Sequence, residues 1–179
     1  MDVVPYLKKI EKFGKDNFMF NISRETAEFL SILSRLKNPK KILEVGTSNG
    51  YSTIWLAKSC DAMIWTIEIL EKKYPLAVEN FKNLKLDKRI NAIHGDAILE
   101  IPKLKGKFDL VFLDAVKKDY IKYIGLIEPL LAKDALIIAD NIVSHKKRAR
   151  EYIDYMNKNY FSSIIDIGQG LMVSLKHHL

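Results

Sequence analysis

The sequence has a single cysteine, no long apolar run and no low-complexity segment. Cys60 has no second cysteine in the chain, which excludes an internal disulfide and fits a protein of the reducing cytosol. No apolar run reaches the roughly 18 residues that a membrane-spanning helix needs, and the first residues, MDVVPYLKKIEKFGKD, lack the apolar region of a signal peptide. These absences predict a cytoplasmic protein with no membrane contact, and 179 residues favour a single domain, 1–179.

Acidic residues are outnumbered, with 22 against 29 basic ones, and the net charge is +7. An excess of this kind is compatible with an acidic partner such as RNA or coenzyme A, and it also occurs on the lysine-rich surfaces of heat-adapted proteins. The densest basic run is His145-Lys146-Lys147-Arg148-Ala149-Arg150, which we expect in the first turns of a helix. Two interpretations stay open for this run: a solvated helix face, or contacts to an anionic acceptor.

One stretch, residues 42–57, has the pattern of a nucleotide-binding corner. An apolar strand runs into the turn Gly46-Thr47-Ser48-Asn49-Gly50, and an amphipathic helix follows. Ser48 replaces the middle glycine of a dinucleotide site, and no lysine follows Gly50 as in a phosphate-binding loop. Glu68 ends the next apolar strand, where an acid normally binds ribose hydroxyls. The pattern favours an adenosine ligand without phosphates; the alternative is a turn that only connects strand to helix.

Strands and helices alternate along the rest of the chain. The predicted strands are 41–45, 63–68, 90–94, 108–114 and 135–140, followed by a hairpin of 161–167 and 171–176 around Gly168-Gln169-Gly170. The predicted helices are 3–15, 24–37, 51–59, 71–86, 97–103, 119–132 and 145–158. This layout predicts an α/β, Rossmann-like fold: a seven-stranded, mostly parallel sheet with a C-terminal antiparallel hairpin and helices on both faces.

A second group of polar residues follows two of these strands. Asp114 ends the fourth strand, and Asp140 and Asn141 end the fifth. If the two strands are neighbours, their ends lie about 5 Å apart. Three hard oxygen ligands then converge, a set that suits Mg²⁺ or Ca²⁺. The alternative is that both aspartates cap the helices that follow them.

Three motifs, LEVGTSNGYS, LDAVKKDY and ADN, together resemble the cation-dependent O-methyltransferases of the catechol and caffeoyl-CoA type. This family belongs to the class I S-adenosylmethionine (SAM) methyltransferases, and the resemblance runs from about Asn21 to the end of the chain. It implies SAM and Mg²⁺, or another divalent cation, as cofactors. It also implies methyl transfer to a hydroxyl of a small molecule with vicinal oxygens. A homodimer is common in the family, with the first helix as a candidate contact.

The resemblance also implies a role for each matching residue. Cofactor contacts are implied for Asn21, Ile22, Glu44, Gly46, Ser48, Gly50, Ser52, Glu68, Gly95, Asp96, Ala97 and Asp114. The cation would be held by Asp114, Asp140 and Asn141, and Lys117 matches the catalytic lysine. A cation on a hydroxyl lowers the pKa of that hydroxyl, and a nearby lysine can accept its proton. The alternative for Lys117 is a solvated lysine at a helix start.

Two features depart from the family pattern. The stretch between Asn141 and the final hairpin is short, and Gln169 stands where the family usually has Asp. Because that stretch normally shapes the acceptor pocket, the resemblance does not predict which acceptor is used. Related proteins modify hydroxylated tRNA bases, so a tRNA methyltransferase is one alternative. A non-catalytic nucleotide-binding module is the other.

Overall fold

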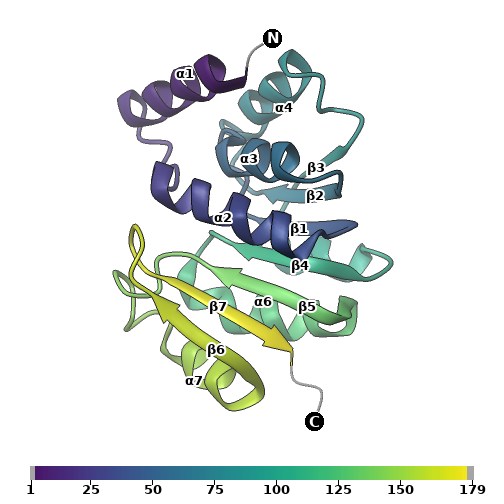
Figure 1. Ribbon diagram of the computed structural model, residues 1–179, viewed down its shortest axis with the longest axis vertical. Coiled ribbons are helices and arrows are strands. Elements are labelled where there is room, and N and C mark those ends of the chain that lie inside the picture. The colour runs from purple at the N-terminus through teal and green to yellow at the C-terminus, as the bar shows by residue number, and fades with distance from the viewer. Residues whose placement is uncertain (1–2, 177–179) are drawn as a thin grey trace.

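Seven strands form one sheet in the order β3-β2-β1-β4-β5-β7-β6 in the computed structural model, which describes residues 3–176 (Figure 1). The strands are β1 (Lys41–Val45), β2 (Met63–Glu68), β3 (Ile90–His94), β4 (Phe108–Leu113), β5 (Leu131–Ala139), β6 (Tyr160–Ile165) and β7 (Leu171–Lys176). The first five pair in parallel, and β7 runs antiparallel to both β5 and β6. The predicted mixed sheet with its C-terminal hairpin is confirmed. The outermost residues of the predicted domain, 1–2 and 177–179, lie outside this description.

Helices cover both faces of the sheet (Figure 1). The helices are α1 (Val3–Asp16), α2 (Arg24–Lys37), α3 (Tyr51–Ser59), α4 (Tyr74–Asn83), α5 (Ala97–Glu100), α6 (Tyr120–Ile127) and α7 (Arg150–Asn159), with short 3₁₀ turns at Ile101–Lys103, Lys117–Asp119 and Glu128–Leu130. One apolar cluster joins α1–α4 to the sheet, and a second joins α5–α7 to it. Burial of apolar surface in these two layers is the main stabilising contribution. None of the helices within residues 3–176 is long and apolar enough to cross a membrane.

The strand order places β1 and β4 side by side at the centre. From β1 the chain moves outwards to β2 and β3, then returns to build β4 and β5 on the other side. In sheets of this kind, ligands bind beyond the carboxyl ends of the strands at this reversal. A ligand site is therefore expected among the residues that follow β1, β2, β4 and β5.

The predicted helix 145–158 was wrong at its beginning, because α7 begins only at Arg150. Residues 142–148 are turns, closed by backbone hydrogen bonds such as Arg148 N–H to His145 O at 2.8 Å. The basic run therefore lies in a loop before the helix, and only Arg150 lies in the first turn.

The predicted helix 119–132 was too long. The α-helix ends at Ile127, and Pro129, which has no backbone N–H, lies in a 3₁₀ turn. The chain then enters β5 early, where Leu131 pairs with Phe108 ahead of a register shift. The predicted helix 71–86 is likewise shorter, Tyr74–Asn83.

Candidate active site

The carboxyl ends of the central strands are aligned along one edge of the sheet. Backbone hydrogen bonds continue just beyond the strands: Gly46 N–H donates to Ile67 O at 3.0 Å, and Asp114 N–H donates to Val45 O at 2.9 Å. Asp140 N–H donates to Leu113 O, also at 2.9 Å. The residues that follow β1, β4 and β5 are thereby held beside one another, as the sequence predicts for neighbouring strands.

The turn after β1 depends on glycine at its first position. Gly46 has φ +102°, and a Cβ there would collide with the carbonyl group of Asp114. Because Gly46 has no side chain, the turn can pack directly against the start of the loop after β4. Gly50, with φ +85°, packs closely on the ring of Phe81 in α4. The turn predicted to hold the cofactor is therefore in contact with the chain that carries the candidate metal ligands.

Glu68 ties this turn to the end of β2. Its carboxylate accepts hydrogen bonds from the backbone N–H groups of Ser48, at 2.7 Å, and Leu70, at 2.8 Å. The residue is only 6% exposed, so these contacts fix the position of the carboxylate. It lies where an acid would bind ribose hydroxyls, and that role stays a prediction.

Glu44 lies fully buried below the turn. Its carboxylate accepts hydrogen bonds from the hydroxyls of Ser52 and Thr66, each at 2.6 Å, and from that of Thr53. Burial raises the pKa of Glu44 to about 7, although the three hydroxyls act in the opposite direction. Thr53 and Thr66 were not predicted from the sequence, since hydroxyls on a helix and a neighbouring strand give no local pattern. The network joins β1, β2 and α3, and direct contact of Glu44 or Ser52 with a cofactor remains a prediction.

The link between α1 and α2 lies against the same turn. The carbonyl of Met19 accepts hydrogen bonds from Ser48 Oγ, at 2.7 Å, and from Lys73 Nζ, at 2.9 Å. Asn21 packs on Gly14, and its amide has no hydrogen-bond partner among residues 3–176. The hydrogen bond between Ser48 and Met19 holds the segment before α2 against the glycine turn. The resemblance implies a cofactor contact for Asn21 in this segment, and that contact stays a prediction. Lys73 was not predicted from the sequence, because nothing there distinguishes it from neighbouring lysines.

Four of the other predicted cofactor residues occupy varied settings. Ile22 is 6% exposed and belongs to the apolar cluster under α1–α4. Gly95 N–H donates to the carbonyl of Glu68 at 2.9 Å, which places the end of β3 beside that acid. Asp96 caps α5 by accepting from Ile98 N–H at 2.9 Å, and Ala97 is buried in the second cluster. The structure brings Gly95 and Asp96 to the strand-end edge, and Ile22 and Ala97 pack in the core. Cofactor contact by these four residues stays a prediction.

The acids after β4 and β5 have different environments. Asp114 forms an ion pair with Lys117, with Oδ1 to Nζ at 2.9 Å, and both side chains are largely buried. Asp140 is 4% exposed, and its buried Oδ1 has no hydrogen-bond partner in the described part of the chain. Burial, together with the nearby negative charge of Asp114, raises the pKa of Asp140 to about 7. A buried carboxylate oxygen without a partner is costly, and a bound cation would satisfy it.

The donor set at this edge consists of oxygen atoms alone. Between Val3 and Lys176, no three His, Cys, Asp or Glu side chains gather in a group that could hold a metal ion. A three-ligand site therefore requires the amide oxygen of Asn141 in addition to Asp114 and Asp140. Two carboxylates and an amide suit a hard cation such as Mg²⁺, which keeps several waters or substrate oxygens in its shell.

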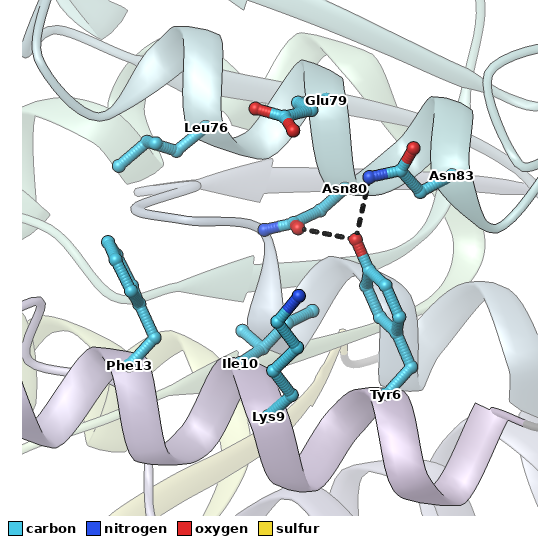
Figure 2. A pocket seen from close by; sticks show the side chains of 8 residues that line it. All are labelled: Tyr6, Lys9, Ile10, Phe13, Leu76, Glu79, Asn80 and Asn83. Carbon is cyan, nitrogen blue, oxygen red and sulfur yellow. Dashed lines mark hydrogen bonds between the residues drawn. The ribbon is translucent and has the colours of Figure 1, made fainter.

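A separate pocket of about 210 Å³ lies between α1 and α4 (Figure 2). Tyr6 OH donates to Asn80 Oδ1 and accepts from Asn83 Nδ2, each at 2.9 Å (Figure 2). The side-chain amide nitrogen of Asn80, Nδ2, donates to the carbonyl of Asn49 in the glycine turn, also at 2.9 Å. This pocket is therefore linked to the turn through one asparagine.

A family model described as O-methyltransferase matches residues 2–172. The chain belongs to the O-methyltransferase family. Over 125 residues it is 33% identical to a catechol O-methyltransferase of Mycobacterium tuberculosis, and over 133 residues it is 34% identical to one of Niastella koreensis. These matches cover 68% and 71% of this O-methyltransferase-family chain, but 57% and 60% of the two relatives. The chain thus spans less than two thirds of their length.

Solved structures share the fold of this family member over nearly its whole length. A Staphylococcus aureus protein with a provisional assignment as a caffeoyl-CoA O-methyltransferase superposes with a TM-score of 0.89 at 26% identity, covering 96% of this chain and 92% of that one. The O-methyltransferase TomG of Streptomyces achromogenes, solved in complex with SAM, gives a TM-score of 0.88 at 24% identity, covering 96% and 89%. At 24% identity, the second likeness shows the fold alone.

Proposed function

We propose that the protein transfers a methyl group from SAM to a hydroxyl of a small molecule with vicinal oxygens, assisted by a divalent cation such as Mg²⁺. The observation that carries this proposal is the buried Oδ1 of Asp140, which has no hydrogen-bond partner among residues 3–176 and lies near Asp114 at the sheet edge beside the glycine turn. Support comes from the two bacterial relatives, both named catechol O-methyltransferase. The lone cysteine supports a cytoplasmic location.

In this proposal the chain's own residues bind, orient and accept a proton. Asp114, Asp140 and Asn141 would hold the cation, which when bound lowers the pKa of an acceptor hydroxyl. Lys117, whose Nζ lies 2.9 Å from Asp114, would first release its own proton to solvent, and its unprotonated Nζ would then accept the hydroxyl proton. Glu68 and the turn would fix SAM so that its activated methyl group lies in line with the acceptor oxygen. The link at Met19 would cover the bound cofactor.

The loop before α7 favours a second acceptor class. Lys146, Lys147, Arg148 and Arg150 are all exposed. The loop follows Asn141 directly, and the N–H groups of Val143 and Ser144 bond the carbonyl of Gln169 in the hairpin turn. The backbone of this loop is thus held close to Asn141 in the chain, and its exposed cationic side chains suit an acceptor that carries phosphate. We therefore keep a tRNA with a hydroxylated base as the alternative acceptor, and a homodimer stays a prediction from the family resemblance.

Isothermal titration calorimetry with SAM, S-adenosylhomocysteine and NAD tests the cofactor part of the proposal. We expect the two SAM-type ligands to bind and NAD not to bind. The Asp140→Ala/Asn141→Ala double variant should keep its SAM affinity and lose divalent-cation binding, because both changes remove oxygen ligands outside the glycine turn. Tight NAD binding without SAM binding would contradict the proposed function. Full activity of the double variant would show that the cation has no part in it.

A further inference from the structure

One buried hydroxyl lies between the two strand ends that carry the candidate metal ligands. Tyr120, the first residue of α6, is fully buried, and its hydroxyl is 3.0 Å from the carbonyl oxygen of Leu113 and 3.2 Å from that of Asp140. Leu113 is the last residue of β4 and directly precedes Asp114. The hydroxyl therefore touches the backbone that presents each of the two acids.

The geometry shows what this contact adds to the sheet. The last paired residues of β4 and β5 are Leu113 and Ala139, and beyond them Asp140 N–H still donates to Leu113 O. The Asp140 carbonyl lies past this ladder, and the single proton of the Tyr120 hydroxyl, shared with the Leu113 carbonyl, reaches it. When both acids are ionised, their like charges repel. This repulsion, which the Lys117 ion pair with Asp114 opposes, acts to separate the strand ends when no cation is bound.

We propose that Tyr120 is a positioning residue that clamps the ends of β4 and β5 and so holds Asp114 and Asp140 at the spacing a divalent cation requires. The cation part of this inference rests on the proposed function, whereas the clamp itself rests on the two hydrogen-bond distances. Residues that hold metal ligands in place commonly change metal affinity 10- to 100-fold when altered, by the general behaviour of such supporting contacts.

The neighbouring ring supplies a matched control. Tyr152 of α7 packs edge-on against Tyr120, with ring centroids 5.5 Å apart and planes at 79°. It is also almost fully buried, at 1% exposed, but its hydroxyl has no hydrogen-bond partner among the described residues. Tyr120→Phe and Tyr152→Phe thus remove the same atom from adjoining sites of the same core, and only the first removes the clamp.

The experiment compares Mn²⁺ binding by electron paramagnetic resonance in the two SAM-saturated variants. Tyr120→Phe should weaken Mn²⁺ binding by about 10-fold or more, Tyr152→Phe should leave it unchanged, and both should keep wild-type SAM affinity. Equal Mn²⁺ affinity in wild type and Tyr120→Phe would overturn the assignment, and so would an equal loss in both variants, since that would report general loosening of the core.

Amide hydrogen exchange without metal tests the clamp independently of the proposed function. We expect faster exchange at the Asp140 and Asp114 amides in Tyr120→Phe and unchanged exchange in Tyr152→Phe, because local opening at the strand ends limits exchange there. Wild-type exchange at both amides in Tyr120→Phe would refute the clamp. If the wild type binds no Mn²⁺ but the exchange difference is present, the proposed cation fails and the clamp stands.

Discussion

At the scale of single residues, Lys117 occupies the position on which the proposed chemistry depends. Its Nζ forms an ion pair with Asp114 and lies 5.8 Å from the centroid of the Tyr120 ring, so the amine is held at the strand-end edge. Its neighbour Lys118 is exposed. The amine of Lys117 is therefore held in place at the candidate site, whereas Lys118 is an ordinary surface charge.

Lys117→Ala should lower kcat by about 10²-fold or more, the usual contribution of a general base. Lys117→Arg should be similarly impaired, because a guanidinium keeps the positive charge but does not release its proton to become a base. SAM affinity, measured by calorimetry, should stay at the wild-type value in both, and Lys118→Ala should keep full activity. Wild-type kcat in Lys117→Arg would show that only the charge matters.

Glu44 makes stability depend on pH. Its pKa is raised from 4.5 to about 7, so the folded state binds the proton more tightly than the unfolded state. The stabilisation is complete below about pH 4.5 and is lost as pH rises through 7, a change of ~3 kcal/mol. Asp140 contributes in the same direction, since its pKa is raised from 3.8 to about 7.

In Glu44→Gln, the free energy of unfolding should therefore lose the part of its pH dependence that comes from Glu44, and the part from Asp140 should remain. Urea unfolding of both proteins at pH 5 and pH 8 measures it: relative to wild type, the variant should gain stability as pH rises. A difference in unfolding free energy that stays constant across this range would mean that Glu44 is not protonated in the fold near neutral pH.

At the scale of elements, the close approach of the β1 turn to the loop after β4 is the most demanding piece of backbone. Gly46→Ala should destabilise the protein by at least about 1–2 kcal/mol, the cost of a side chain in the left-handed region, before the collision with Asp114 is counted. Gly125→Ala in α6 is the matched control, since nothing lies within 4 Å of its added Cβ. It should stabilise by about 0.5–1 kcal/mol. Thermal unfolding of both decides this, and a neutral Gly46→Ala would contradict the described contact.

The parallel strands could be predicted from the sequence because short, continuous apolar runs such as residues 63–68 and 108–113 are typical of strands buried on both faces. The boundary errors lie where tertiary contacts decide: Leu131 joins β5 by pairing with Phe108, and the basic loop bonds to the hairpin turn at Gln169. The candidate site divides in the same way. Asp114, Lys117 and Asp140 follow strands and could be found, whereas the Tyr120 bridge and the Thr66 contact to Glu44 depend on residues distant in sequence.

At the scale of the whole molecule, the net charge is +7, and several of the basic residues cluster in and directly after the loop before α7. Replacing Lys146, Lys147, Arg148 and Arg150 with Ala should weaken tRNA binding and flatten its salt dependence, by about 0.7 in the log–log slope for each lost contact to single-stranded RNA. SAM affinity should not change, because these side chains lie outside the glycine turn. Filter binding across a salt series measures the slope. No tRNA binding by the wild type at low salt would leave the small-molecule acceptor as the sole proposal.

The central claim, cation-assisted methyl transfer from SAM, is tested most directly by following transfer of a labelled methyl group to a panel of catechols, CoA esters and tRNA. The account predicts a methylated hydroxyl product on one of these acceptors, loss of transfer after EDTA treatment, and recovery when Mg²⁺ is added back. Transfer that continues undiminished in EDTA would contradict the account, because Asp114, Asp140 and Asn141 would then have no part in activating the acceptor.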